Sequence, residues 1–243
     1  MSVAATPADP AARPVPAELA RRISAAFGPE HWYGNRWDLH YTRAKLGSDP
    51  LYPGVCAALR GSGAPVLDLG CGLGLLAHAL RADGQAMAYR GIDLDAAKIA
   101  RARRAAARAG LADAMFEAQD LADPAFDLAS LGHHGNVAVL DVLQFVPAEA
   151  RRPLLEKMTA MLAPGARLVI RTGLADGSRR ARITRAVDVF SRVVGWMGAT
   201  PGGYPEPEML RAAFDAAGLR SQFTPLYGRT PFNNWLVVAT RDA

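Results

Sequence analysis

The sequence predicts an α/β fold, a doubly wound sheet of mostly parallel strands with helices on both faces. Three observations support this prediction. From residue 64 onward, short apolar segments alternate with helical ones, as strand–helix units do. Alternating glycines at 70–74 follow the first apolar segment, where the chain must turn from strand into helix. The last two apolar segments, after residue 219, are separated by a short break, which predicts an antiparallel hairpin that closes the sheet.

The expected elements follow the chain in order after an Ala- and Pro-rich tail, which covers residues 1–16. Strands are expected at 66–69, 87–93, 115–119, 136–141, 167–172, 220–227 and 234–240. Helices are expected at 18–27, 73–81, 95–109, 148–162 and 208–217, with a further inserted helix at 178–200. Residues 1–60 would then be a tail and cap, and 61–243 the sheet domain. Because every expected strand follows residue 63, we expect the core to assemble without the first 60 residues.

Composition excludes several classes of protein. The chain has 243 residues, of which 50% are hydrophobic and 21% charged, so it can bury a sizeable core. No apolar run reaches the roughly 20 residues that span a bilayer, and the first 16 residues contain no apolar leader. Two cysteines, Cys56 and Cys71, are too few for a disulfide scaffold or a Cys-rich zinc site, so we expect a cytoplasmic protein without a metal.

Residues 31–52 concentrate aromatic side chains and histidines in an N-terminal helical or aromatic cap. Its members are His31, Trp32, Tyr33, Trp37, His40, Tyr41 and Tyr52. Aromatic residues bury large areas wherever they pack, so this cap can simply cover the core. It can also form a lid over a ligand, and the two interpretations are compatible.

The stretch 66–74, an apolar strand followed by Asp68 and three alternating glycines, is the strongest chemical signal. Glycines are needed where the backbone approaches a ligand closely or adopts positive φ. The spacing from Gly72 to Ala77 also fits the dinucleotide-binding fingerprint. An acid two residues before the first glycine would be unfavourable beside a pyrophosphate. It suits a cationic ligand with an ammonium group, which disfavours a nicotinamide-dependent dehydrogenase.

Three further acids follow the next three expected strands. Asp93 lies 19 residues after Gly74, close to the spacing of a carboxylate that holds ribose hydroxyls, while Asp95 is better placed to cap the next helix. Asp120 follows the third strand, where a carboxylate can accept a hydrogen bond from an adenine amino group. Asp141 ends the fourth. Ligands bind at the carboxyl edge of a parallel sheet, so we expect these acids to line one site.

With these motifs the chain resembles the class I S-adenosylmethionine-dependent methyltransferases. The matching stretches are DLGCGLG at 68–74, GIDLD at 91–95, AQDL at 118–121, LDVLQFV at 140–146 and LAPGARLVIRTG at 162–173. The resemblance implies a Rossmann-like, seven-stranded sheet whose last strand is antiparallel and inserted between its neighbours. It implies S-adenosylmethionine as the cofactor. The cofactor-binding positions it implies are Asp68, Gly70, Cys71, Gly72, Gly74, Asp93, Leu94, Asp120, Leu121 and Asp141.

A general base is needed only if the nucleophile arrives protonated, as a hydroxyl would. Many small-molecule members of the family have His where this chain has Gln144, so that base is missing. His31 and His40 lie in the aromatic cap and are the candidate catalytic residues. Candidate substrate-binding residues are Tyr41, Lys45 and Arg171.

The favoured function is methyl transfer to a small-molecule substrate of aromatic or acyl type. One alternative is a nucleic-acid methyltransferase, which the net charge of +5 and a basic stripe on one expected helix favour. The stripe comprises Lys98, Arg101, Arg104 and Arg108. A solvated helix face explains it better, and the sequence after the fourth strand is not the Pro-Pro-aromatic run of amino-methylating nucleic-acid enzymes. A second alternative is a cofactor-binding protein without catalysis. The methylated atom and the oligomeric state stay open.

Overall fold

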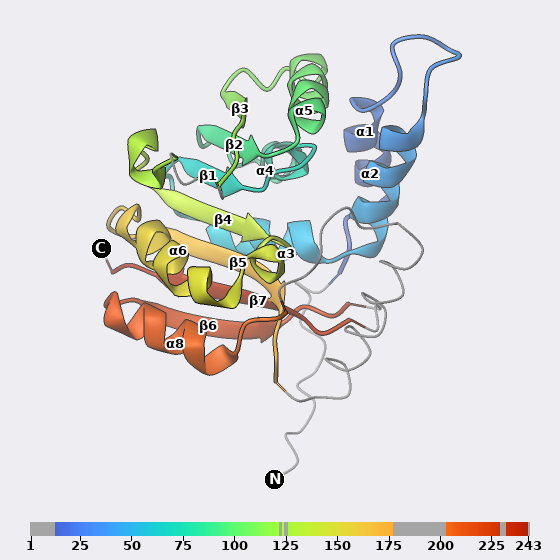
Figure 1. Cartoon of the computed structure of the whole chain (residues 1–243). Helices are drawn as coiled ribbons and strands as arrows, with labels where there is room; N and C mark the ends of the chain where they lie inside the picture. Colours follow the sequence, from blue (N-terminus) through green and yellow to red (C-terminus); the bar gives the residue numbers. More distant parts are fainter. Residues whose placement is uncertain (1–12, 122, 124–125, 177–202, 229–231, 243) are drawn as a thin grey trace.

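The computed structural model describes residues 13–121, 123, 126–176, 203–228 and 232–242. Its centre is a seven-stranded sheet in the order β3-β2-β1-β4-β5-β7-β6 (Figure 1). The strands are β1 (Val66–Leu69), β2 (Tyr89–Asp93), β3 (Ala114–Ala118), β4 (Asn136–Leu140), β5 (Arg167–Gly173), β6 (Arg220–Pro225) and β7 (Asn234–Thr240).

Strands β1 to β5 are parallel, whereas β7 runs antiparallel to both of its neighbours, β5 and β6. This arrangement confirms the expected doubly wound sheet with its last strand inserted in the antiparallel sense. Each expected strand is present, with ends that shift by at most two residues from the predicted bounds.

Helices cover both faces of this sheet. On one face lie α6 (Ala148–Ala160) and α8 (Pro207–Ala216), and on the other lie α4 (Leu75–Ala82) and α5 (Ala96–Arg108). Two short 3₁₀ helices, η2 (Leu128–Leu131) and η3 (Leu143–Phe145), flank β4. Two separate buried clusters correspond to the two faces, because alternate strand residues point to opposite sides. The inserted helix expected at 178–200 lies outside the described residues.

Three helices precede the sheet: α1 (Ala17–Ala25), α2 (Trp37–Ser48) and α3 (Leu51–Leu59). The sequence predicted the first, but α2 and α3 fall within or just after the aromatic segment, which it did not resolve into helices. Helix α3 covers the central strands, and Leu51, Val55 and Leu59 are completely buried in the same cluster as β1, β4 and β5. Helix α3 therefore supplies part of that core, which counts against the expectation that the core assembles without the first 60 residues.

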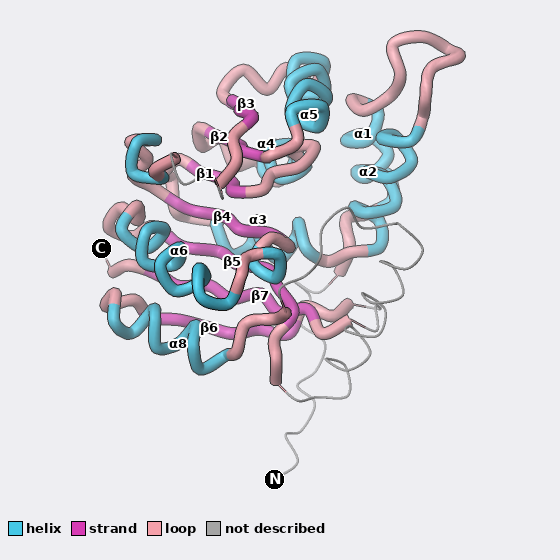
Figure 2. The backbone as a smooth tube through the Cα atoms, in the orientation of Figure 1, coloured by secondary structure: helices cyan, strands magenta, loops and turns pink. Residues whose placement is uncertain are grey.

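The aromatic segment divides into an outer and an inner part. Trp32 and Tyr33 are 84% and 72% exposed, in a loop between α1 and α2 that extends away from the body of the protein (Figure 2). Tyr52, at the start of α3, is buried. The two interpretations of this segment thus apply to different residues: its inner end packs on the core, and its outer end faces solvent. Among the described residues, no helix combines the length and apolar character that crossing a membrane requires.

Candidate functional site

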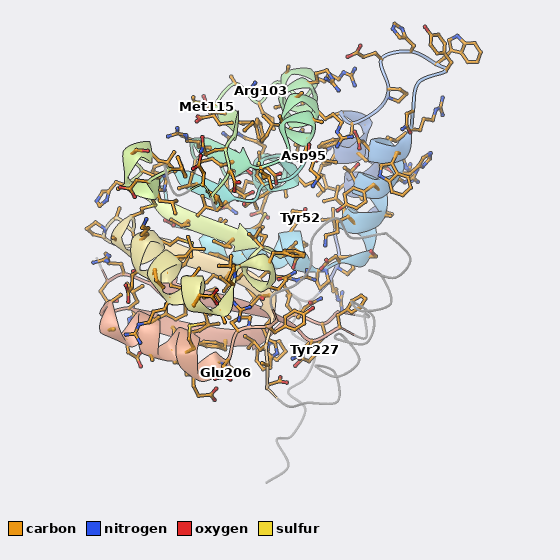
Figure 3. All side chains as sticks on the ribbon, in the orientation of Figure 1. Tyr52, Asp95, Arg103, Met115, Glu206 and Tyr227 are labelled. Carbon is orange, nitrogen blue, oxygen red and sulfur yellow. The ribbon has the colours of Figure 1, made fainter. Side chains whose placement is uncertain are left out.

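The sheet order brings the four strand-end acids into one row. Since β3, β2, β1 and β4 are neighbours, Asp120, Asp93, Asp68 and Asp141 follow one another along the carboxyl edge. Open α/β sheets bind ligands at this edge. Tyr52 of α3 lies at the same edge (Figure 3), so the cap and the sheet meet at the candidate site.

The glycine loop between β1 and α4 has positive φ at all three alternating glycines, 79°, 56° and 74° for Gly70, Gly72 and Gly74. A side chain at Gly70 would collide with Val142, and one at Gly74 would collide with Phe116. A Cβ on Gly72 would meet no atom within 4 Å. The outer two glycines therefore allow close packing, while the middle one leaves open space at the ligand side of the loop.

Asp93 holds this loop in place. Its Oδ2 accepts a hydrogen bond from the Gly72 N–H at 2.8 Å, and its Oδ1 accepts one from the Asp95 N–H at 2.9 Å. Asp95 in turn caps α5 by accepting from the backbone N–H groups of Ala97 and Lys98. The capping role expected of Asp95 is confirmed, and the ribose role of Asp93 stays a prediction. A half-buried carboxylate with further acceptor capacity is suited to ribose hydroxyls.

Asp68 is buried on the face of β1 that looks toward α3 and α4. Its strand partners are Gly91 on β2 and Ala138 on β4. Oδ2 accepts a hydrogen bond from the Tyr89 hydroxyl at 2.5 Å, whereas Oδ1 has no hydrogen-bond partner among the described residues. The pKa of Asp68 is raised to about 7, chiefly because of burial; the hydrogen bond from Tyr89 opposes the rise, and Asp93 adds a smaller increase. A buried carboxyl oxygen without a partner is costly unless a ligand donor meets it, so it fits an ammonium group.

Asp141 is held by two cations. It adopts a left-handed backbone conformation, φ 61°, and its carboxylate pairs with Arg171 and, at 3.4 Å, with Lys45 Nζ. Asp49 completes the cluster, because its Oδ2 lies 2.7 Å from Lys45 Nζ and 3.1 Å from Arg171 Nη2. The four side chains come from α2, the turn before α3, and the ends of β4 and β5.

The pKa values of Asp141 and Lys45 are shifted in the directions that keep both side chains charged. Burial alone would raise the pKa of Asp141, but Arg171 and Lys45 bring it below its ordinary value. Burial alone would lower the pKa of Lys45, yet Asp141 and Asp49 raise it above the ordinary value. The cluster therefore holds two cations and two carboxylates, and it carries no net charge. Lys45 and Arg171, predicted to bind substrate, have carboxylate partners within the protein.

The structure does not bring the two candidate bases to the sheet edge. His31 is exposed in the loop before α2 and stacks on Tyr33, with ring centroids 5.4 Å apart. His40 is exposed on the outer face of α2, where it lines an open hollow with Arg43 and Gly47. Tyr41 is half-exposed. After burial, its phenol is the next cause that raises the pKa of Tyr52.

The remaining predicted cofactor residues lie around the edge. Leu94 is 70% exposed directly after β2, and Asp120 and Leu121 are half-buried after β3. The Cys71 side chain packs over Gly91, and burial raises the pKa of its thiol, so it stays protonated.

Sequence reasoning missed Asp49 and Tyr89 as partners in the site. The four-residue spacing of Lys45 and Asp49 was a signal for an ion pair, had a helix been expected there. A tyrosine within an expected buried strand was a signal that a buried partner exists for its hydroxyl.

The basic stripe of α5 is paired with carboxylates. Lys98 lies 3.8 Å from Asp95, Arg101 lies 3.5 Å from Asp38, and Arg104 and Arg108 lie 3.6 and 3.7 Å from Glu30. Three of these four contacts connect α5 to α2 or to the loop before it. The stripe therefore fastens the N-terminal segment to the sheet domain.

Comparison with known proteins agrees with the fold and the glycine loop. Residues 66–165 match a family model described as a methyltransferase domain. Residues 66–165 of this chain are therefore a methyltransferase domain. The matched residues begin at β1 and include all four strand-end acids.

Among curated proteins, a carboxy-S-adenosyl-L-methionine synthase from Chromohalobacter salexigens is 30% identical over 138 residues. The match covers 55% of this chain and 50% of that relative, so the methyltransferase chain described here spans about half the length of the relative it matches. Among solved structures, a magnesium protoporphyrin IX methyltransferase from Synechocystis PCC 6803 with bound S-adenosylhomocysteine has a TM-score of 0.58 and 20% identity. It covers 93% of both chains, and at this identity it shows the fold.

A second similar structure has 26% identity and a TM-score of 0.52, over 80% of this chain and 82% of the other. It is reported for the conversion of a disulfide bond into a thioacetal group during echinomycin biosynthesis.

Proposed function

We propose that this protein transfers the methyl group of S-adenosylmethionine to a small organic molecule. The observation that carries the proposal is the unpartnered, buried Oδ1 of Asp68 beside the open glycine loop of a methyltransferase domain. Both similar structures also concern small organic molecules, a magnesium porphyrin in one and an intermediate of echinomycin in the other.

The proposed cofactor site uses each strand end for one part of the ligand. Asp68 would receive the ammonium group, and Gly72 would leave space for the amino-acid end above the loop. Each carboxylate oxygen of Asp93 accepts one backbone hydrogen bond and can accept another. Asp93 would hold the ribose hydroxyls with these remaining acceptor sites. The exposed Leu94 would cover one face of the adenine, and Asp120 with Leu121 would meet its edge. Gly70, Cys71 and Gly74 would keep the loop in its packed conformation.

When bound, the cofactor supplies an electrophilic methyl group on a sulfonium, so the protein's main tasks are to align a nucleophile and exclude water. Helix α2 carries Trp37 and Tyr41, both of them substantially exposed. These rings suit a substrate with an apolar or aromatic part. His31 lies in a loop and His40 on the outer face of α2. Their role as general bases therefore stays a prediction. The cytoplasmic location also stays a prediction.

The nucleic-acid alternative loses its specific support in this structure. It rested on the basic stripe of α5, and three of those four cations pair with acids of the N-terminal segment. The net charge of +5 alone does not favour nucleic acid over other partners.

A transfer assay with methyl-labelled S-adenosylmethionine tests the proposal. The acceptors are a panel of small aromatic and acyl metabolites and, separately, bulk RNA. We expect label in a small-molecule acceptor and S-adenosylhomocysteine as the cofactor product. The Asp68→Asn variant should lose transfer. Label only in RNA, or a carboxylated cofactor as the product, would contradict the proposal.

A further inference from the structure

We infer that the loop at 28–36, between α1 and α2, docks on an anionic lipid surface. The rings of Trp32 and Tyr33 would enter the headgroup region, and Arg36 and Arg43 would lie against the lipid phosphates. This surface is separate from the proposed cofactor site, and the inference does not depend on the proposed function.

The tip of the loop exposes two aromatic side chains that pack on each other rather than on the core. Trp32 and Tyr33 are 84% and 72% exposed, and their rings meet edge to face with centroids 5.7 Å apart. Trp37, at the start of α2, is 69% exposed. The loop extends away from the body of the protein (Figure 2). Because clusters of large exposed apolar side chains mark contact surfaces, we expect these rings to meet a partner.

The backbone of the loop holds the tip in this position. The Gly34 N–H donates to the His31 carbonyl at 2.9 Å, and a side chain at Gly34 would collide with Pro29. Asn35 Oδ1 accepts a hydrogen bond from the Trp37 N–H at 2.8 Å, which fixes the entry into α2. The rings are therefore presented outward before a partner arrives, and this lowers the cost of ordering the loop on binding.

The two acids near the tip face inward, toward α5. Glu30 lies 3.6 and 3.7 Å from Arg104 and Arg108, and Asp38 lies 3.5 Å from Arg101. Their charges are thus neutralised on the side of the sheet domain, so they do not oppose an anionic partner at the tip.

The cations near the tip have no such partners. Arg36 and Arg43 are exposed, and neither forms an ion pair with another described residue. With His40 between them, they have the i, i+4, i+7 spacing of one helix face, which begins directly after the tip. Exposed rings beside an unpaired basic face are complementary to a surface that is apolar inside and anionic outside.

Size and chemistry favour a lipid surface over a folded protein partner. An aromatic side chain buries about 150–250 Å², so the two rings of the tip fall short of the roughly 800 Å² that each partner buries in a standard protein interface. Trp and Tyr also concentrate at membrane–water interfaces, because their rings are apolar with one polar end. Each neighbouring arginine adds attraction to anionic headgroups.

Flotation of the full chain with lipid vesicles tests the inference. One set of vesicles contains phosphatidylcholine alone, and the other contains phosphatidylcholine mixed with phosphatidylglycerol. We expect the wild type to bind the anionic vesicles, with an affinity that falls as salt rises. Trp32→Ser combined with Tyr33→Ser should weaken this binding by about 10-fold or more. Arg36→Gln combined with Arg43→Gln should weaken it by roughly 5-fold for each cation removed.

Matched controls separate the loop from general apolar and charge effects. Met115→Ser removes an apolar side chain that is 61% exposed on β3. Arg152→Gln combined with Arg220→Gln lowers the net charge as much as the loop variant does, from exposed positions on α6 and β6. Both controls should bind the anionic vesicles as the wild type does.

Tryptophan fluorescence gives a second measurement. Lipids brominated along their acyl chains should quench the wild type and leave the ring variant unquenched. Trp32→Ser alone is the second variant, in case the double variant does not fold. Its side chain is 84% exposed, so the core does not depend on it.

A wild type that does not float with anionic vesicles, or a folded ring variant that floats as well as the wild type, would overturn the inference. Methyl transfer to a soluble acceptor that is lost in a ring variant with unchanged vesicle binding would show instead that the rings form a lid over the site.

Discussion

At the level of single residues, Asp68 combines burial, one hydrogen bond and a neighbouring acid in a way that makes its ionisation depend on a ligand. Burial disfavours the carboxylate, and Tyr89 supplies one donor to Oδ2 while Oδ1 has none among the described residues. An ammonium group at Oδ1 would supply the missing donor and the opposite charge. Asp68 is therefore the residue at which pH and cofactor affinity should be linked.

This linkage predicts that S-adenosylhomocysteine binds several-fold more tightly at pH 7.5 than at pH 6.0. The pKa of Asp68 in the free protein is about 7, so at pH 6.0 most molecules must lose a proton before the ammonium group can pair. The range stops at pH 7.5 because an α-amino group itself titrates at about 7.7–8.0. Calorimetry across this range measures the slope, and Asp68→Asn should abolish it. A wild type with the same Kd at both ends of the range would contradict the prediction.

The same shift affects stability in the opposite direction. The folded-state pKa of Asp68 lies above its unfolded value, so its contribution favours the folded state at low pH and is lost as pH rises toward about 7. We expect Asp68→Asn to lessen the fall in the free energy of unfolding of the ligand-free protein between pH 5 and pH 7. Urea unfolding at the two pH values gives the comparison, and an equal fall in both proteins would exclude the assignment.

Asp93 has a double role, in the loop and toward the ribose. Asp93→Ala removes the acceptor for the Gly72 and Asp95 N–H groups as well as the proposed contact with the ribose. We expect it to weaken S-adenosylhomocysteine binding by roughly 1.5–3 kcal/mol. Calorimetry on the folded variant measures the loss. An unchanged Kd of S-adenosylhomocysteine would contradict the assignment of Asp93 to the ribose.

At the level of elements, α3 and the end of β2 show two leucines in contrasting surroundings. Leu59 is completely buried between α3 and the sheet, whereas Leu94 is 70% exposed beside the proposed adenine site. The same substitution to alanine should therefore affect stability at one position and binding at the other.

We expect Leu59→Ala to lower the free energy of unfolding by about 2–5 kcal/mol, because it leaves a cavity in a packed core. Leu94→Ala should change stability by less than about 0.5 kcal/mol and weaken cofactor binding instead. Urea unfolding and calorimetry on both variants measure the two effects. Loss of stability in the Leu94 variant, or none in the Leu59 variant, would show that the burial pattern does not hold in solution.

At the level of the whole molecule, the N-terminal segment is fastened to the sheet domain by both apolar and polar contacts. Arg167 donates to the backbone oxygens of Ala58 and Arg60, and the Gln85 side chain donates to that of Cys56. The cluster around Asp49 and Asp141 ties α2 to the strand ends. Segment and sheet therefore share one core and one site.

A chain that starts at residue 61 should consequently fail to fold cooperatively. It would expose the sheet surface that Leu51, Val55 and Leu59 cover, and losing even one such side chain costs about 2–5 kcal/mol. Whole domains are stable by only about 5–15 kcal/mol. Thermal unfolding followed by circular dichroism measures the outcome. A chain that starts at residue 13 is the control and should unfold like the full protein. A cooperative transition in the shorter chain would contradict this prediction. It would show that the first 60 residues form a cap separate from the core.

The sequence by itself determined the strand–helix alternation, the glycine loop and the row of acids at the strand ends. These features depend on residues close together in the chain: periodic burial within one element, and backbone conformations that only glycine adopts easily. Neighbouring parallel strands then place their carboxyl ends at one edge, so Asp68 and Asp93 could be assigned to one site before any contact was known.

Only the tertiary structure decided what each charge faces. The spacing of Lys45 and Asp49 indicates one ion pair, but nothing in the sequence indicates that Arg171 and Asp141 join it. The stripe on α5 has the pattern of a solvated face, yet the partners of its three arginines lie on a loop and a helix more than 60 residues earlier. Helix α3 belongs to the core because it packs on strands β1, β4 and β5. These strands come later in the chain, so the sequence of α3 alone did not indicate this packing. Burial and charge pairing act through space, so sequence patterns within one element could not reveal these partners.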